Sequence, residues 1–157
     1  MQPFRLRKDA RDWFKALRED DSFKIDFDVF YFCFIAGIAK KQKLPVTNEY
    51  TAELVPNFPG RYADRGKLLV ALFLARELDH LGVTMHEKKE VHSSIAKLVD
   101  PTSPHNLSDE GVKHFNQYAH GGYNVLLEWF ANDRPRSLET FLRIFKKNLD
   151  TALLPTL

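Results

Sequence analysis

Six histidines lie in the second half of the chain, and two of them have a carboxylate at a spacing suited to metal binding. Glu77 is three residues before His80, and Glu110 is four residues before His114. Side chains at these spacings share one face of a helix, so each pair could supply two ligands to one ion. A di-iron bundle needs a second Glu-x-x-His motif, which the chain lacks. We therefore predict no metal site and no cofactor, and we keep a small helical metal-binding enzyme as the second alternative function.

No pattern of an activated nucleophile is present in the sequence. Cys33 is the single cysteine and lies between Phe32 and Phe34, where burial raises the pKa of a thiol instead of activating it. The chain has no Gly-x-Ser-x-Gly motif, and its glycines do not form a phosphate-binding loop. A single cysteine also excludes an intramolecular disulfide and a zinc site with several thiolates. The sequence therefore predicts no catalytic residues.

The segment from Phe115 to Asn124 combines aromatic, amide and imidazole groups with two adjacent glycines. One interpretation makes Tyr118, His120 and Tyr123 a ligand or partner surface, with His120 as an acid or base. The other makes Gly121 and Gly122 a point where two helices pack closely, because glycine lets backbones approach each other. The sequence favours the packing interpretation and keeps the surface interpretation as a candidate site.

The formal net charge of +2 conceals three basic segments. Residues 1–18 carry six basic and two acidic side chains, residues 40–67 carry six and three, and residues 134–147 carry five and one. If these segments converge, they form a positive face that attracts phosphates. The commoner interpretation is that they are ordinary solvated helix faces. The candidate anion-binding or nucleic-acid-binding residues flank the middle segment and are Lys40, Lys41, Lys43, Arg61, Arg65 and Lys67.

The element that must organise the fold is an apolar segment in the first third of the chain. Apolar residues recur with a period near 3.6 through residues 26–41 and occupy nearly the whole circumference of a helix. A helix that is apolar on all sides is buried, so we expect this one at the centre, carrying many of the 13 phenylalanines. Residues 23–29 also alternate with period two, which leaves a strand there as the alternative.

The remaining periodic segments also predict helices. We expect helices over 9–18, 63–81 and 87–99, a helix capped by Ser108 that breaks near Gly121 and resumes over 123–131, and a last helix capped by Ser137. In the 63–81 helix the expected buried residues are Leu68, Leu69, Leu72, Phe73 and Leu78. Pro45, Pro56 and Pro59 exclude a continuous helix between residues 42 and 62 and predict a long connection.

These elements predict an all-α protein of six or seven helices around the central one. A chain of 157 residues corresponds to one domain, which we place at 1–157. The charged N-terminus has no apolar segment typical of a secretory signal, and the longest apolar run has 11 residues, about half of what a membrane-spanning helix needs. We therefore expect a cytoplasmic protein with no membrane partner.

Without catalytic motifs, the sequence favours a non-catalytic interaction module with a protein partner, acting as an accessory subunit of a larger intracellular assembly. The first alternative is a nucleic-acid-binding accessory protein of a DNA-processing system that uses a basic face. Binding to DNA that weakens with ionic strength would distinguish the alternative from the main hypothesis.

Overall fold

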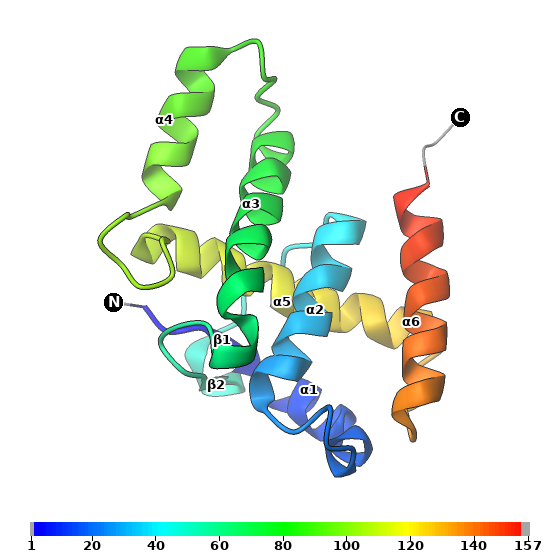
Figure 1. Ribbon diagram of the computed structural model, residues 1–157. Helices are drawn as coiled ribbons and strands as arrows, with labels where there is room; N and C mark the ends of the chain where they lie inside the picture. The colour runs from blue at the N-terminus through cyan, green and yellow to red at the C-terminus, as the bar shows by residue number, and fades with distance from the viewer. Residues whose placement is uncertain (1, 155–157) are drawn as a thin grey trace. The chain divides into compact units, whose positions relative to one another are not determined.

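The computed structural model describes residues 2–154 and confirms an all-α fold (Figure 1). Over this range the chain forms six α-helices, three short 3₁₀ helices and one sheet of two three-residue strands. None of the helices within residues 2–154 combines the length and the hydropathy needed to cross a bilayer.

The chain divides into two compact units. Unit 1 combines the N-terminal residues up to Phe4 with Glu53–Asn116, and unit 2 combines Arg5–Ala52 with the residues from Gln117 onwards. Helix α5 (Asp109–Trp129) contributes its first turns to unit 1 and the rest to unit 2. The single domain over residues 1–157 stays a prediction.

Unit 2 contains the helix that the sequence placed at the centre. Helix α2 (Asp26–Lys40) is buried along most of its length, and Lys41 ends it in a left-handed conformation with φ of 56°. At its start the Asp28 carboxylate accepts the Ile25 N–H at 3.1 Å. Residues 23–25 precede the helix and form no strand. The helical interpretation is therefore correct, because the apolar period of 3.6 extends well beyond the few residues that alternate.

The other elements of unit 2 are short, apart from the C-terminal helix. They are strand β1 (Arg5–Arg7), helix α1 (Lys8–Trp13), the 3₁₀ helices η1 (Lys15–Glu19) and η2 (Asn48–Tyr50), strand β2 (Thr51–Glu53) and helix α6 (Leu138–Leu153). Helices α2 and α6 lie side by side (Figure 1). The two strands were not predicted, because three residues are too few to show an alternating pattern.

Phenylalanine side chains form the core of unit 2. The ring of Phe141, on α6, lies 5.3 Å from Phe14, 5.1 Å from Phe32 and 5.3 Å from Phe130, measured between centroids. These distances are typical of paired aromatic rings, which add packing energy beyond the area they bury. The many phenylalanines of the sequence therefore act as core in this unit.

Unit 1 contains the 3₁₀ helix η3 (Gly60–Tyr62), helix α3 (Ala63–His80), helix α4 (Lys88–Leu98) and the start of α5. Helices α3 and α4 lie side by side (Figure 1). In its core the ring of Phe115 lies 5.5 Å from Phe4 and 5.3 Å from Phe73.

Helix α3 has leucines on opposite faces, and the structure buries only one of these faces. Leu69, Phe73 and Leu78 are buried as expected, whereas Leu68 and Leu72 are exposed. The expectation that all of these residues are buried was therefore wrong for two of them. Leu68 and Leu72 each precede a buried residue by one position, which turns their side chains by about 100° around the helix axis and away from the core.

Helix α5 runs without interruption through Gly121 and Gly122, so the expected break is absent. The residues before and after the two glycines supply intrahelical hydrogen bonds, and tertiary packing outweighs the low helix propensity of glycine. At the other end of α5, Ala131 and Asn132 take positive φ values of 50° and 65°, and the Asn132 N–H donates to the Leu127 carbonyl at 2.8 Å. This turn redirects the chain toward α6.

Candidate functional site

The six predicted anion-binding residues fall into two sets of three. Lys40, Lys41 and Lys43 belong to unit 2, at the end of α2 and just after it, whereas the other three residues belong to unit 1, around the start of α3. All except Lys43 are exposed, and the Lys43 ammonium lies 5.5 Å from the centre of the Tyr118 ring. Anion binding by the two sets stays a prediction. The unit-1 residues are Arg61, Arg65 and Lys67.

The structure buries the second predicted site. The exposed fractions of Tyr118, His120 and Tyr123 are only 1%, 4% and 6%. These side chains therefore do not form an exposed partner surface, and a ligand role for them stays a prediction.

Close backbone packing by the neighbouring glycines explains this burial. A Cβ atom at Gly122 would overlap the carbonyl group of Cys33 on α2, and one at Gly121 would overlap the carbonyl of Gln42. The glycines thus let α5 approach the backbone of α2 and of the residues after it, which turns this side of α5 into the core. The packing interpretation of the two glycines is confirmed.

The environment of His120 keeps its imidazole neutral at neutral pH. Burial is the main cause that lowers the His120 pKa to about 4, and the nearby charges of Arg7 and Arg5 lower it further. The Arg7 guanidinium donates to the His120 carbonyl at 3.3 Å and forms an ion pair with Asp9 at 2.7 Å. A general acid or base works best with a pKa near the operating pH, so this site does not favour the proposed acid–base role.

The two carboxylate–histidine pairs differ in geometry. Glu77 is buried whereas His80, at the end of α3, is exposed, so the two side chains of this pair have different environments. Glu110 and His114 form the surface pair at a spacing of four residues that is expected from the sequence, with 2.9 Å between Oε1 and Nε2. Among residues 2–154, no three histidine, cysteine or carboxylate side chains are grouped so that they could hold a metal ion.

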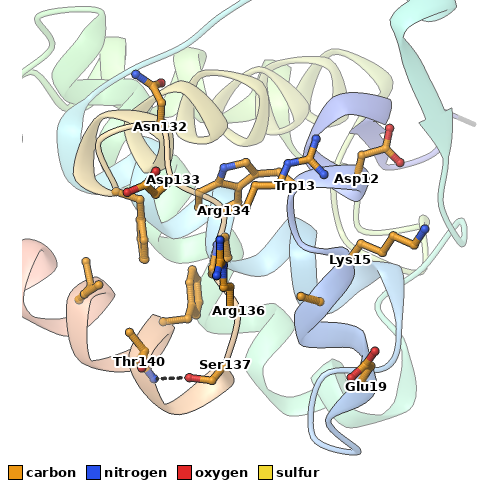
Figure 2. A pocket seen from close by; sticks show the side chains of 15 residues that line it. Asp12, Trp13, Lys15, Glu19, Asn132, Asp133, Arg134, Arg136, Ser137 and Thr140 are labelled. Atoms are coloured by element: carbon orange, nitrogen blue, oxygen red, sulfur yellow. Dashed lines mark hydrogen bonds between the residues drawn. The ribbon is translucent and has the colours of Figure 1, made fainter.

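A cavity in unit 2 was not predicted from the sequence. It has a volume of about 1030 Å³ and lies between α1, η1, the residues after α5 and the first turns of α6. Figure 2 shows Asp12, Lys15 and Glu19 on the side formed by α1 and η1, and Ser137 and Thr140 at the start of α6. We call this cavity the α1–α6 pocket.

The α1–α6 pocket contains polar groups that have no partner within residues 2–154. The side chains of Lys15, Arg134 and Arg136 line it, and none of them forms a hydrogen bond or an ion pair with a described residue. Trp13 also lines it, with an exposed fraction of 4%, and its buried Nε1 has no hydrogen-bond partner in the same range. Buried donors are normally satisfied, so this indole N–H is an exception that requires an explanation.

A capped helix start forms another part of the pocket wall. The Thr140 N–H donates to the Ser137 Oγ at 3.3 Å (Figure 2), which is the N-cap bond predicted for the last helix. The positive end of the α6 dipole therefore lies at the pocket. Lys15 and Arg136 belong to the basic segments 1–18 and 134–147 and both line this pocket, whereas convergence of all three basic segments stays a prediction.

A smaller cavity of about 150 Å³ lies in unit 1 beside Phe58, Lys67 and His105. His105 Nδ1 accepts the Leu107 N–H at 3.1 Å, which places the proton of the neutral ring on Nε2. Burial is the main cause that lowers the pKa of His105, so the neutral form is favoured.

Comparison with known proteins does not identify the chain. No family model, no curated protein and no solved structure matches it.

Proposed function

We propose that this protein is a non-catalytic interaction module that binds an amphipathic helix of a partner protein on the outer face of α3. The observation that carries the proposal is the exposure of Leu68 and Leu72, whose exposed fractions are 60% and 37%. Under this proposal the chain acts as an accessory subunit of a larger assembly.

The outer face of α3 has the pattern of a helix that packs against another helix. Ala71 and Ala75 are also exposed, and together with Leu68 and Leu72 they follow spacings of three and four residues. Leucines at such spacings supply anchors for an apolar surface, and the alanines allow a partner backbone to come close. We define these four residues as the α3 stripe.

Polar residues limit the α3 stripe at both ends. Asp64 precedes it by one turn and Asp79 follows it by one turn, and both are exposed. An apolar patch with a polar rim is typical of a protein-binding site. None of the four stripe residues is a cation, whereas a nucleic-acid site presents cations to phosphates; the exposed Arg61 and Arg65 precede the stripe. The α3 stripe therefore supports a protein partner over the nucleic-acid alternative.

The proposal is tested by site-specific photo-crosslinking in cells that express the protein. A photoreactive amino acid replaces Ala71, and the crosslinked products are identified by mass spectrometry. We expect one discrete partner. The double variant Leu68→Asp/Leu72→Asp should lose this product, because buried aspartates would be left unpaired in the interface.

A matched control separates loss of the interface from a general effect of added charge. Leu142 and Leu153 on α6 have exposed fractions of 41% and 58%, close to those of the two stripe leucines. The variant Leu142→Asp/Leu153→Asp should keep the crosslink and the melting temperature. A product that survives Leu68→Asp/Leu72→Asp, or disappears equally in the α6 control, contradicts the proposal.

A further inference from the structure

We infer that the α1–α6 pocket of unit 2 binds an organic anion, in which a carboxylate or a phosphate monoester is attached to an apolar or aromatic body. This inference concerns a different surface from the α3 stripe and does not depend on the proposed protein partner. It rests on the two arginines and the helix start on one wall of the pocket, and on the apolar groups beside them.

The arginines that line the pocket are suited to a ligand that accepts hydrogen bonds. Arg134 and Arg136 are two residues apart on the segment that leads into α6, and Figure 2 shows both in the middle of the pocket. A guanidinium group presents several N–H donors that match the geometry of a carboxylate or a phosphate. The Trp13 indole lines the same pocket, but its Nε1 has almost no accessible surface, so Trp13 is a nearby reporter of binding and not a donor to the ligand.

The apolar walls require that the ligand also has an apolar part. Phe130, Phe141 and Ile144 line the pocket together with the indole of Trp13. The volume of about 1030 Å³ is at the upper end of ligand pockets, which extend over about 300–1,000 Å³. A free inorganic anion would leave most of this volume and all of the apolar wall without contacts. An aromatic or aliphatic body on the ligand would occupy this volume and contact the apolar wall.

Three carboxylates in the same pocket determine how the anion is held. Asp12, Glu19 and Asp133 offset the three cations, so the pocket has no net charge that would attract a polyanion from a distance. A cationic ligand would meet these acids, but both arginines and the positive end of the α6 dipole lie on the wall formed by residues 134–140 and favour an anion there. We therefore assign an anion that is bound by short-range hydrogen bonds and by packing.

The test uses phenyl phosphate as the probe and the indole N–H of Trp13 as the reporter. The chain has two tryptophans, and Trp129 does not line the pocket, so the variant Trp129→Phe leaves one indole signal for NMR spectroscopy. We expect a saturable shift of the Trp13 Nε1–H resonance on titration. Inorganic phosphate should bind at least about tenfold more weakly, because it cannot bury an apolar body.

Two arginine substitutions on nearby positions provide the matched comparison. Arg136→Gln should weaken phenyl phosphate binding by about tenfold or more, since it removes a charged donor. Arg143→Gln, in α6 but outside the pocket, should leave the affinity unchanged. Both arginines are exposed, so both variants are expected to fold.

Three results would overturn the inference. The first is the absence of a saturable Trp13 shift with phenyl phosphate. The second is an equal loss of affinity in Arg136→Gln and Arg143→Gln, which would place the anion outside the pocket. The third is a shift of the same size and affinity with benzylamine, which would show that the carboxylates and not the arginines select the ligand.

Discussion

At the scale of single residues, Gly122 determines how closely α5 packs on α2. The space that a side chain would occupy at this position is filled by the Cys33 carbonyl, and the backbone nitrogen of Gly37 is also close. Backbone atoms cannot move away as the end of a flexible side chain can. Gly60 differs, because no atom lies near the position of its Cβ.

We predict that Gly122→Ala destabilises the protein by about 3 kcal/mol or more, because the added methyl group forces α5 away from α2. For a chain of this size the melting temperature should fall by about 6–12 °C. The control Gly60→Ala should leave it nearly unchanged. Thermal unfolding of both variants measures the difference, and similar melting temperatures would contradict the packing interpretation.

His120 leads to a prediction about pH. The buried imidazole has its pKa lowered from 6.5 to about 4, so the unfolded chain binds a proton at a higher pH than the folded chain does. The stability that this group contributes is therefore fully present above about pH 6.5 and is lost as the pH falls toward 4. Between pH 7 and pH 4.5 the loss amounts to about 2 kcal/mol.

Urea unfolding at the two pH values tests this prediction. The free energy of unfolding of the wild type should fall by about 2 kcal/mol more than that of His120→Asn, which does not titrate in this range. His92→Gln, at an exposed position on α4, should behave as the wild type. An unchanged pH dependence in His120→Asn would show that His120 does not remain neutral when folded.

At the scale of elements, Ser108 connects two helices of unit 1. Its Oγ accepts the Gly111 N–H at 3.0 Å, which caps the start of α5, and donates to the Lys97 carbonyl in the last turn of α4 at 2.6 Å. Among the described residues 2–154, the Ser137 Oγ makes only the capping bond to α6. The two serines therefore have the same capping function, but only Ser108 also satisfies a carbonyl of a neighbouring helix.

We predict that Ser108→Ala costs about 2 kcal/mol, whereas Ser137→Ala costs about 1 kcal/mol, the usual value of an N-cap. The additional cost arises because the Lys97 carbonyl loses its donor. Denaturant unfolding of the two single variants gives the comparison directly. Equal costs, or a larger cost at Ser137, would mean that the bond to Lys97 contributes nothing to stability.

At the scale of the whole molecule, the charges are distributed over two compact units. Net charge alone describes this chain poorly, because its basic residues are concentrated in segments that the fold assigns to different units. The nucleic-acid alternative requires that Lys40, Lys41 and Lys43, or the cations around the start of α3, bind phosphates.

That alternative predicts a measurable effect of charge reversal. Changing Lys40, Lys41 and Lys43 to Glu, or Arg61, Arg65 and Lys67 to Glu, should weaken binding to duplex DNA and reduce the salt slope by about 0.9 for each phosphate that the protein no longer neutralises. Fluorescence anisotropy at several salt concentrations measures both quantities. The control variant changes Lys88, Lys89 and Lys97, which are exposed on α4, to Glu. An equal effect in this control, or no DNA binding at low salt, would eliminate the alternative.

The local pattern of residues determined most of the helices. The long apolar period of residues 26–41 predicted α2 within one residue at its end, and Ser108 and Ser137 predicted two helix starts that their capping bonds confirm. These features could be predicted because periodicity and capping depend on residues close together in the chain. The predicted break at Gly121 and Gly122 was wrong, because it relied on the low helix propensity of glycine without the tertiary packing.

Tertiary structure alone decided which faces are buried and which donors are left unsatisfied. Leu68 and Leu69 are adjacent residues of the same type, yet only Leu69 points into the core. The sequence left both a packing and a surface interpretation for the segment with Tyr118 and His120, and the structure buries both side chains beside the close approach at Gly122. The α1–α6 pocket joins Trp13 to Arg134 and Arg136, which are more than a hundred residues away in sequence. Such long-range contacts leave no local pattern, because they arise only when the helices pack.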